Sequence, residues 1–222
     1  MKIIDITGPI FEGLQHYNGD VKSFELKKIK MKYTNDKEYD VYSMEGMLNI
    51  TGTYFETAGD ILGYQISDIP IEKLFMIDTY VLNMPLEGLK IVDERPCVFL
   101  EDIKKAEKGN IPEKSGIILS TGYGKNWEKK DYLAKSWFLK KESMDYLLDK
   151  KPFLIAFDTP YAENDVNFED VFNRFFKNDV YSLVACINVE KIKKYNVKLV
   201  IMPIRLLKVG LGCPARAIVL EE

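Results

Sequence analysis

Hydrophobic and polar residues follow one another in this chain in patterns that predict strands separated by short helices. The predicted strands cover residues 3–6, 24–32, 39–47, 76–82, 96–99, 116–122, 153–157, 183–187, 197–203 and 215–220. The predicted helices cover residues 69–74, 100–108, 141–148 and 168–176. No internal repeat, low-complexity segment or Pro/Ser-rich linker divides the chain. The pattern therefore predicts one α/β domain over residues 1–222, with a mixed central β-sheet flanked by helices.

Two parts of this pattern stand out. Residues 116–122 form a continuous apolar run bounded by glycines, which is typical of a strand buried on both faces. In contrast, 24–32 alternates apolar residues with lysines, as a half-exposed strand does. Because Asn35 and Asp36 separate it from the similar segment 39–47, we expect a hairpin there.

Composition narrows the class of protein. The 222 residues are 46% hydrophobic, enough for a full core, and the net charge of −3 gives no basic face for nucleic acid or an anionic membrane. No apolar run approaches the roughly 20 residues that span a bilayer, and Asp5 stands where a signal peptide would be apolar, so we expect a cytoplasmic protein. The three cysteines lack metal or disulfide spacing and are expected to be buried hydrophobes.

The stretch 48–60 contains Gly52-Thr53 followed by the acidic Glu56 and a small-residue turn. Five further segments, in order, accompany it: Tyr17-Asn18-Gly19-Asp20, Ile69-Pro70-Ile71-Glu72-Lys73-Leu74, Leu119-Ser120-Thr121-Gly122-Tyr123, Ala156-Phe157-Asp158-Thr159-Pro160 and Gly212-Cys213-Pro214-Ala215-Arg216-Ala217. Together they resemble the cyclase family, which includes bacterial kynurenine formamidase and other metal-dependent amide and lactone hydrolases. The resemblance implies the cyclase-type fold and, for an active member, a hydrolase acting on C–N bonds of linear amides.

The metal motif of the resembled family is His-x-Gly-Thr-His-x-Asp-x-Pro-x-His. Aligned on Gly52 and Thr53, its His, His, Asp, Pro and His fall on Ile50, Tyr54, Glu56, Ala58 and Asp60. A later ligating His on a helix and a Glu on the next strand fall on Asn173 and Ala185. All the histidines of the motif are absent.

This replacement changes the expected chemistry. Zinc takes three or four N, S or carboxylate donors, but Ile50 and Ala185 donate nothing, and the phenol of Tyr54, with a reference pKa of about 10, is a poor ligand. Only Glu56 and Asp60 remain, and two carboxylates hold Mg²⁺ or Ca²⁺ weakly. We therefore expect no cofactor and no metal site, although the resembled family uses zinc.

Several residues are candidates for a functional site. Glu56 and Asp60 are the candidate catalytic pair, since two close carboxylates form a general acid beside a base; either one could instead cap a helix or pair with a lysine. The resemblance places six residues in the pocket: His16, Asp20, Thr53, Tyr54, Asp158 and Asn173. For Tyr54, filling the vacated space is an alternative to binding substrate, and for Asp158 the Asp-Thr-Pro segment is also ordinary turn chemistry.

Two long predicted loops, 122–136 and 161–169, are candidates for carrying a site. An aromatic group lies in the first loop and directly after it, and would form a pocket wall, a lid or an oligomer contact: Tyr123, Trp127, Tyr132, Trp137 and Phe138.

Three functions remain open from the sequence. The first is a divergent cyclase-family protein that keeps a small-molecule pocket but has lost the zinc-dependent amide hydrolase centre. The second is an active metal-assisted or carboxylate-based hydrolase of amides or lactones that uses Glu56 and Asp60. The third is a non-catalytic oligomeric or partner-binding protein whose pocket is filled. The resemblance also implies a homodimer or homotetramer.

Overall fold

The computed structural model of the chain describes residues 1–14, 21–33, 37–164 and 171–222. Within this part of the chain the central sheet has eight strands in the order β1-β13-β12-β5-β8-β10-β11-β4. Their bounds, in sheet order, are Lys2–Asp5, Gly212–Glu221, Asn196–Pro203, Ile77–Asn83, Gly116–Ser120, Leu154–Phe157, Tyr181–Val184 and Tyr54–Glu56. Strands β5, β8, β10 and β11 run parallel, and their neighbours on both sides are antiparallel. The predicted mixed sheet is confirmed.

Strand β4 closes this sheet on itself. It pairs with β11 on one side and with the start of β13 on the other, although β4 and β13 are far apart in strand order. The result resembles a barrel. Every residue of β8 and of β10 is buried. The strand covered on both faces that was predicted over 116–122 is therefore confirmed for 116–120, where β8 ends.

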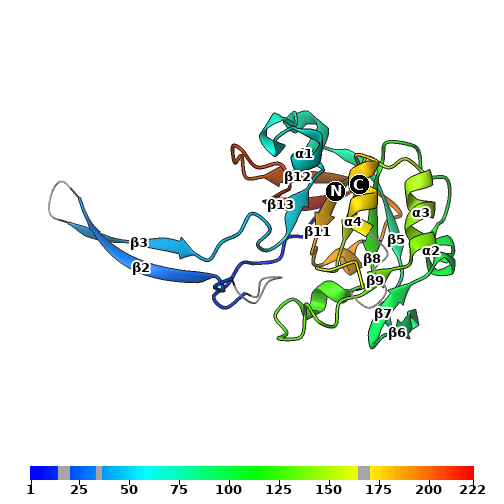
Figure 1. Cartoon of the computed structure of the whole chain (residues 1–222), viewed down its shortest axis with the longest axis horizontal. Helices are drawn as coiled ribbons and strands as arrows, with labels where there is room; N and C mark the ends of the chain where they lie inside the picture. The colour runs from blue at the N-terminus through cyan, green and yellow to red at the C-terminus, as the bar shows by residue number, and fades with distance from the viewer. Residues whose placement is uncertain (15–20, 34–36, 165–170) are drawn as a thin grey trace.

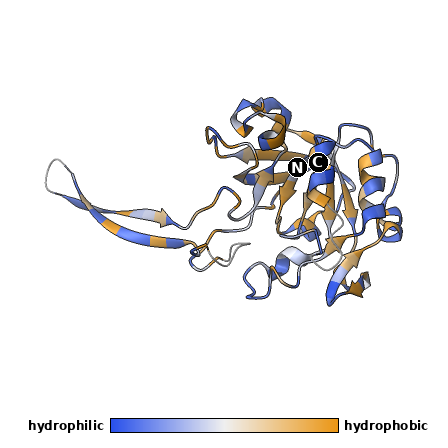
Figure 2. Ribbon diagram, viewed as in Figure 1, coloured by the Kyte–Doolittle hydropathy of each residue, from blue (hydrophilic) through white to orange (hydrophobic). Residues whose placement is uncertain are grey.

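Helices cover one face of the sheet. The apolar sides of α2 (Leu100–Ala106), α3 (Lys141–Asp149) and α4 (Val171–Lys177) form one core cluster with alternate residues of β8 and β10. The opposite residues of these strands belong to a second cluster, closed by the 3₁₀ helices η1 (Ile66–Asp68), η2 (Ile71–Leu74) and η5 (Val189–Lys191). Figure 2 shows that the strands of the body are mainly hydrophobic, in contrast to the hydrophilic stretches of the helices beside them.

Smaller elements complete the body of the molecule. A three-stranded sheet contains β6 (Lys90–Val92), β7 (Arg95–Val98) and β9 (Phe138–Leu139). The short helices are α1 (Gly59–Leu62), η3 (Leu86–Gly88) and η4 (Tyr123–Asn126). None of the helices in the described residues has the length and hydrophobicity needed to cross a bilayer. Cys97, Cys186 and Cys213 are buried and form no disulfide, as predicted.

A two-stranded ribbon projects from this body (Figure 1). It consists of β2 (Glu25–Lys32) and β3 (Glu38–Glu45), paired antiparallel over their whole length, and is called the arm below. The hairpin predicted from the alternation of apolar residues and lysines is therefore confirmed. Its turn lies outside the described residues.

Most predicted boundaries differ from the structure by one to three residues, and three elements need a closer comparison. The helix expected over 69–74 is the shorter 3₁₀ helix η2, which begins at Ile71. The strand expected over 183–187 ends at Val184, since Ala185 has a positive φ of 59° and turns the chain out of the sheet. The start of the helix expected at 168 lies outside the described residues, and α4 is described from Val171.

The central strand provides a test of the core. Leu119 in β8 is completely buried, so Leu119→Ala should lower the free energy of unfolding by about 3 kcal/mol, measured by urea denaturation. Leu62→Ala, on the exposed side of α1, is the matched control and should change it by less than about 0.5 kcal/mol. Equal losses in the two variants would contradict this assignment of the core.

Candidate functional site

A cavity of about 220 Å³ lies where the base of the arm meets the loop that follows β8. Its lining comes from five separate parts of the chain: Phe11, Gly13, Leu14, Ile50, Gly52, Trp127, Glu128, Lys129, Lys130, Tyr132, Leu133, Pro160 and Ala185. The wall is mainly aromatic and aliphatic, and its charged members, Glu128, Lys129 and Lys130, are exposed at the rim.

The aromatic wall is held in place by its own contacts. The Tyr123 and Tyr132 rings stack with centroids 5.4 Å apart, and the Trp127 ring meets Tyr132 edge-on at 5.3 Å. The Trp127 indole N–H donates to the Pro9 carbonyl at 2.9 Å. Position 8 accepts only a glycine, because a Cβ on Gly8 would lie 2.3 Å from a carbon of the Trp127 ring. A rigid ring surface of this kind suits a flat apolar ligand.

The sequence had left the role of the loop aromatics open. Trp127 and Tyr132 line the cavity, so the pocket-wall interpretation holds for these two residues. Trp137 and Phe138 are fully buried in the body instead. The Trp137 indole N–H donates to the Asp158 carboxylate at 2.8 Å, which explains how a tryptophan is tolerated at this depth.

Thr53 ties together three segments beside the cavity. Its hydroxyl donates to the Ala185 carbonyl at 2.7 Å and accepts the Gly8 N–H at 2.9 Å. The left-handed backbone of Ala185 aims that carbonyl at Thr53. Thr53 was a predicted pocket residue; it is buried behind the cavity wall, whereas its neighbour Gly52 and its partner Ala185 line the cavity.

Ile50 and Tyr54 lie close together beside β13. A Cβ on Gly212 would meet the Ile50 Cγ2 atom at 2.9 Å and the Tyr54 Cδ2 atom at 3.5 Å, so both side chains pack where this glycine leaves room. Tyr54 is buried in the core cluster on the helix side of the sheet. Ile50 is half-buried and lines the cavity.

Glu56 is a buried carboxyl group at the end of β4. It is 7% exposed and accepts the Ser182 hydroxyl at 3.0 Å from the paired strand β11. Burial raises the pKa of Glu56 to about 7, the Ser182 hydrogen bond opposes this rise, and the nearby charge of Glu163 adds to it. Glu56 thus has a pKa suited to proton transfer near neutral pH, but it is not among the residues that line the cavity.

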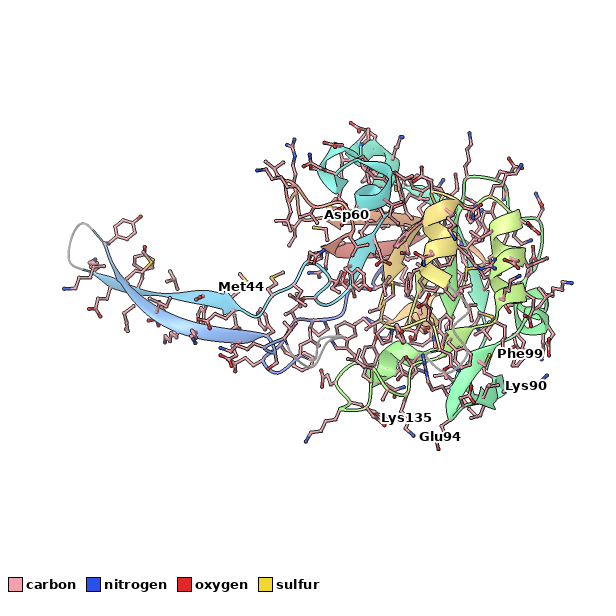
Figure 3. All side chains as sticks on the ribbon, in the orientation of Figure 1. Met44, Asp60, Lys90, Glu94, Phe99 and Lys135 are labelled. Carbon is pink, nitrogen blue, oxygen red and sulfur yellow. The ribbon has the colours of Figure 1, made fainter. Side chains whose placement is uncertain are left out.

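Asp60 has a different environment. After β4 the chain turns, fixed by the Thr57 hydroxyl, which donates to the Gly210 carbonyl at 2.5 Å and accepts the Gly59 N–H at 3.1 Å. This turn places Asp60 on the exposed helix α1 (Figure 3). The two residues of the candidate catalytic pair therefore lie in different environments. Glu56 is buried at the end of β4, whereas Asp60 follows the turn and is exposed to solvent on α1.

The remaining candidates from the sequence are placed as follows. Asn173 is exposed on α4, and Ala185, the other late ligand position, lines the cavity. His16 and Asp20 lie outside the described residues.

Asp158 forms a buried hydrogen-bonding centre after β10. Its carboxylate accepts the backbone N–H groups of Thr121, Gly122 and Tyr123, the Thr121 hydroxyl and the Trp137 indole. Burial raises the pKa of Asp158 to about 6, while these donors act in the opposite direction. Asp158 does not line the cavity; it fixes the loop that carries the aromatic wall.

The sequence pattern shared by the family described as putative cyclase matches residues 4–164 of this chain. The chain belongs to the putative cyclase family. Solved structures of cyclase-type hydrolases have the same fold as this chain. Comparison with curated proteins gave no match.

Three of these structures are similar over almost the whole of this cyclase-family chain. An isatin hydrolase bound to the product analogue thioisatinate has a TM-score of 0.81 at 18% identity, covering 99% of this chain and 92% of its own. A potential metal-dependent hydrolase with cyclase activity has a TM-score of 0.75 at 18% identity, covering 100% and 98%. Isatin hydrolase A from Labrenzia aggregata, bound to benzyl benzoate, has a TM-score of 0.75 at 19% identity, covering 98% and 93%.

The residues present here do not fit a zinc ion of the kind the family implies. At the ligand positions of the motif, Ile50 and Ala185 carry no donor atom, and the carboxylates of Glu56 and Asp60 are in separate environments. Over the described part of the chain, no three His, Cys, Asp or Glu side chains come together as a metal site. Zinc binds three or four such donors, so no step of a zinc-hydroxide reaction follows from these residues.

Several site residues were missed in the sequence. Phe11, Leu14 and Leu133 gave no signal there, because apolar residues in loops are indistinguishable from core residues before the fold is known. Glu163 lies in the predicted loop 161–169, which was a candidate for carrying a site. Its effect on the pKa of Glu56 could not be predicted, because it depends on the proximity of segments that are distant in the sequence.

The raised pKa of Glu56 predicts a pH-dependent stability. The folded state binds the proton more tightly than the unfolded state, whose pKa is near 4.5, so the free energy of unfolding should fall as pH rises from 4.5 to about 7. Glu56→Gln removes this titration and should raise the free energy of unfolding at pH 8 by up to about 3 kcal/mol, with little change at pH 4.5. Urea denaturation across this range measures it.

The exposed Glu142→Gln is the control for this experiment, and it should keep the pH dependence of the wild type. A Glu56→Gln variant whose stability falls at pH 8 would show that the carboxylate form is the one the fold needs.

Asp158→Asn tests the hydrogen-bonding centre. One carboxylate oxygen becomes an NH₂ group facing N–H or O–H donors, which should lower the free energy of unfolding by about 3 kcal/mol. Asp149→Asn, at the exposed end of α3, should change it by less than about 0.5 kcal/mol. Thermal unfolding followed by circular dichroism distinguishes the two, and unchanged stability in Asp158→Asn would refute this role.

Proposed function

We propose that this cyclase-family chain binds a small, flat, mainly apolar molecule in the cavity beside the altered metal motif, without zinc-dependent amide hydrolysis. The observation that carries the proposal is the position of Ile50 and Ala185. Both occupy motif positions that are ligands in the resembled family, and both line the cavity. The space remains, while the donors around it are replaced by apolar side chains.

The size and lining of the cavity indicate the class of ligand. An apolar cavity of roughly 150 Å³ holds benzene. A volume of about 220 Å³, with Trp127 and Tyr132 on one wall, suits a molecule of one or two rings. Lys129 and Lys130 at the rim form no ion pair with any described residue, and they would favour a ligand that carries an anionic group at its outer end.

The printed descriptions of two structural relatives agree with this class. One isatin hydrolase is bound to thioisatinate and another to benzyl benzoate, both of them aromatic molecules. Identities of 18% and 19% support a shared fold only, so these compounds serve here as probes of the cavity.

The carboxylate-based hydrolase is less well supported. Glu56 has a pKa near 7, as a general base requires, but it is covered by Ser182 and does not line the cavity. Asp60 is exposed on α1 and supplies no second group beside it. A filled pocket is also less well supported, because a cavity of about 220 Å³ is present.

Ligand binding can be followed by the fluorescence of the two tryptophans, one of which lines the cavity. Thioisatinate should quench the wild type with a saturable titration. Leu133→Trp, which fills the cavity, should weaken binding by about tenfold or more. The same substitution at Leu207, an exposed residue away from the cavity, should leave binding unchanged. Equal binding by both variants would place the ligand elsewhere.

Metal content separates binding from hydrolysis. Protein purified without chelator should contain zinc well below one equivalent per chain, and N-formyl aromatic amides should not be turned over. One equivalent of zinc, together with turnover that chelation removes, would overturn the proposal.

A further inference from the structure

We propose that a second cavity, at the amino ends of the four parallel strands, binds a nucleoside monophosphate, with its base on an aromatic surface and its phosphate at two lysines. This cavity has a volume of about 610 Å³, compared with about 220 Å³ for the first. Four of the residues that line it begin or precede β5, β8, β10 and β11, in this order: Ile77, Lys114, Phe153 and Tyr181.

The second cavity is separate from the first. Pro160 and Ala185, which line the first cavity, follow the carboxyl ends of β10 and β11. Phe153 and Tyr181, which line the second, stand at the amino ends of the same two strands. Because every residue of β10 is buried between these two ends, a ligand in one cavity does not touch a ligand in the other.

Two aromatic rings of the second cavity are anchored to the core. The Tyr181 ring meets the Phe153 ring edge-on with centroids 5.0 Å apart, and it meets the completely buried Phe55 ring at 5.2 Å. The backbone around them is also fixed, since the Tyr181 N–H donates to the Phe153 carbonyl at 3.1 Å. A rigid aromatic surface of this kind favours the stacking of a planar base.

Phe75 adds an exposed ring to this surface. Its side chain is 57% exposed, and it lines the cavity just after η2. One exposed apolar side chain is ordinary by itself, but Phe75 lines a cavity that already contains the rings of Phe153 and Tyr181. A base stacked there would remove apolar surface of both the protein and the ligand from water.

Two lysines of the cavity favour an anion. Lys73 and Lys114 line it, are exposed, and form no ion pair with any described residue. Glu113, next to Lys114 in the chain, is paired instead with Lys151 at 2.7 Å. A phosphate monoester carries a charge of about −1.5 to −2 at pH 7, so it matches two lysines better than a carboxylate with a single charge does.

The acidic residues of the lining are already partnered. Asp78 forms an ion pair with Lys198 at 2.6 Å, and the Asp179 carboxylate accepts the Tyr64 hydroxyl at 3.2 Å. Asp179 keeps its charge and remains exposed, so it can also accept the hydroxyl groups of a ribose. Aromatic rings, a carboxylate and two lysines thus correspond to the base, the sugar and the phosphate of one ligand.

Three related ligands test these parts of the proposal on the wild-type protein by isothermal titration calorimetry. Adenosine monophosphate should bind saturably, with a dissociation constant below about 1 mM. Adenosine lacks the phosphate and ribose 5-phosphate lacks the base, so each should bind at least about tenfold more weakly. Absence of saturable binding of adenosine monophosphate at about 5 mM, or a fragment that binds as tightly as the whole molecule, would overturn the proposal.

Two double variants test the phosphate contact. Lys73→Gln with Lys114→Gln should weaken the binding of adenosine monophosphate by about tenfold or more. Lys108→Gln with Lys135→Gln removes the same charge from two exposed lysines that line neither cavity, and should change binding by less than about twofold. Equal effects of the two double variants would show that the cavity lysines do not bind the phosphate.

A pair of aromatic substitutions tests the stacking surface. Phe75→Ala should weaken the binding of adenosine monophosphate by about tenfold and leave that of ribose 5-phosphate unchanged. Tyr42→Ala, on the arm, removes a ring with the same exposed fraction of 57% and should change neither. Equal binding of adenosine monophosphate by the two variants would remove Phe75 from the site.

The two cavities are tested independently. Adenosine monophosphate should bind with the same dissociation constant in the presence of saturating thioisatinate, and also to Leu133→Trp, in which the first cavity is filled. Competition between the two ligands, or loss of nucleotide binding in Leu133→Trp, would place the nucleotide in the first cavity and overturn the proposal. Failure of thioisatinate to bind the wild type would count against the first cavity alone.

Discussion

The three residues of β4 hold two strands at once, and the rest of the site depends on this bridge. Phe55 lies opposite Leu183 of β11 and Cys213 of β13, so backbone hydrogen bonds on both edges of β4 close the sheet. The completely buried Phe55 ring anchors the bridge in the core. Since Thr53, Tyr54 and Glu56 are part of this segment or adjoin it, their positions follow from the closure of the sheet.

This constraint explains why the altered motif still has a defined shape. In a metal site the ligands hold one another through the ion. Here the Thr53 hydroxyl joins Gly8 and Ala185 by hydrogen bonds, and Ile50 and Tyr54 pack beside Gly212. These contacts among the residues themselves hold the loops of the motif in position.

Much of the fold could be predicted from the sequence because the strongest signals are local. The continuous apolar run of β8 and the alternation of apolar residues with lysines in β2 each specify a strand by themselves. Strand β4 could not be predicted in this way, since three residues carry no periodicity and its pairing joins segments more than 120 residues apart. The end of β11 at Val184 was missed because the left-handed backbone of Ala185 is set by a tertiary hydrogen bond, not by propensity.

The candidate site also combines features that could be predicted from the sequence with features that depend on tertiary contacts. The resemblance placed Ile50, Tyr54 and Ala185 near one another, and Ile50 with Ala185 does line the cavity. The separation of Glu56 from Asp60 depends on the Thr57 turn, which sequence spacing does not reveal. The pKa of Glu56 depends on Ser182 and Glu163, which come from distant parts of the chain.

The arm has one more consequence. Its strands pair only with each other, whereas Phe11 and Leu14 before it and Ile50 after it belong to the cavity wall. The segments that enter and leave the arm therefore also form part of the cavity wall. The Gly13 N–H, which donates to the Phe24 carbonyl, joins the wall to the residue that precedes the arm, so the cavity and the arm share one structural base.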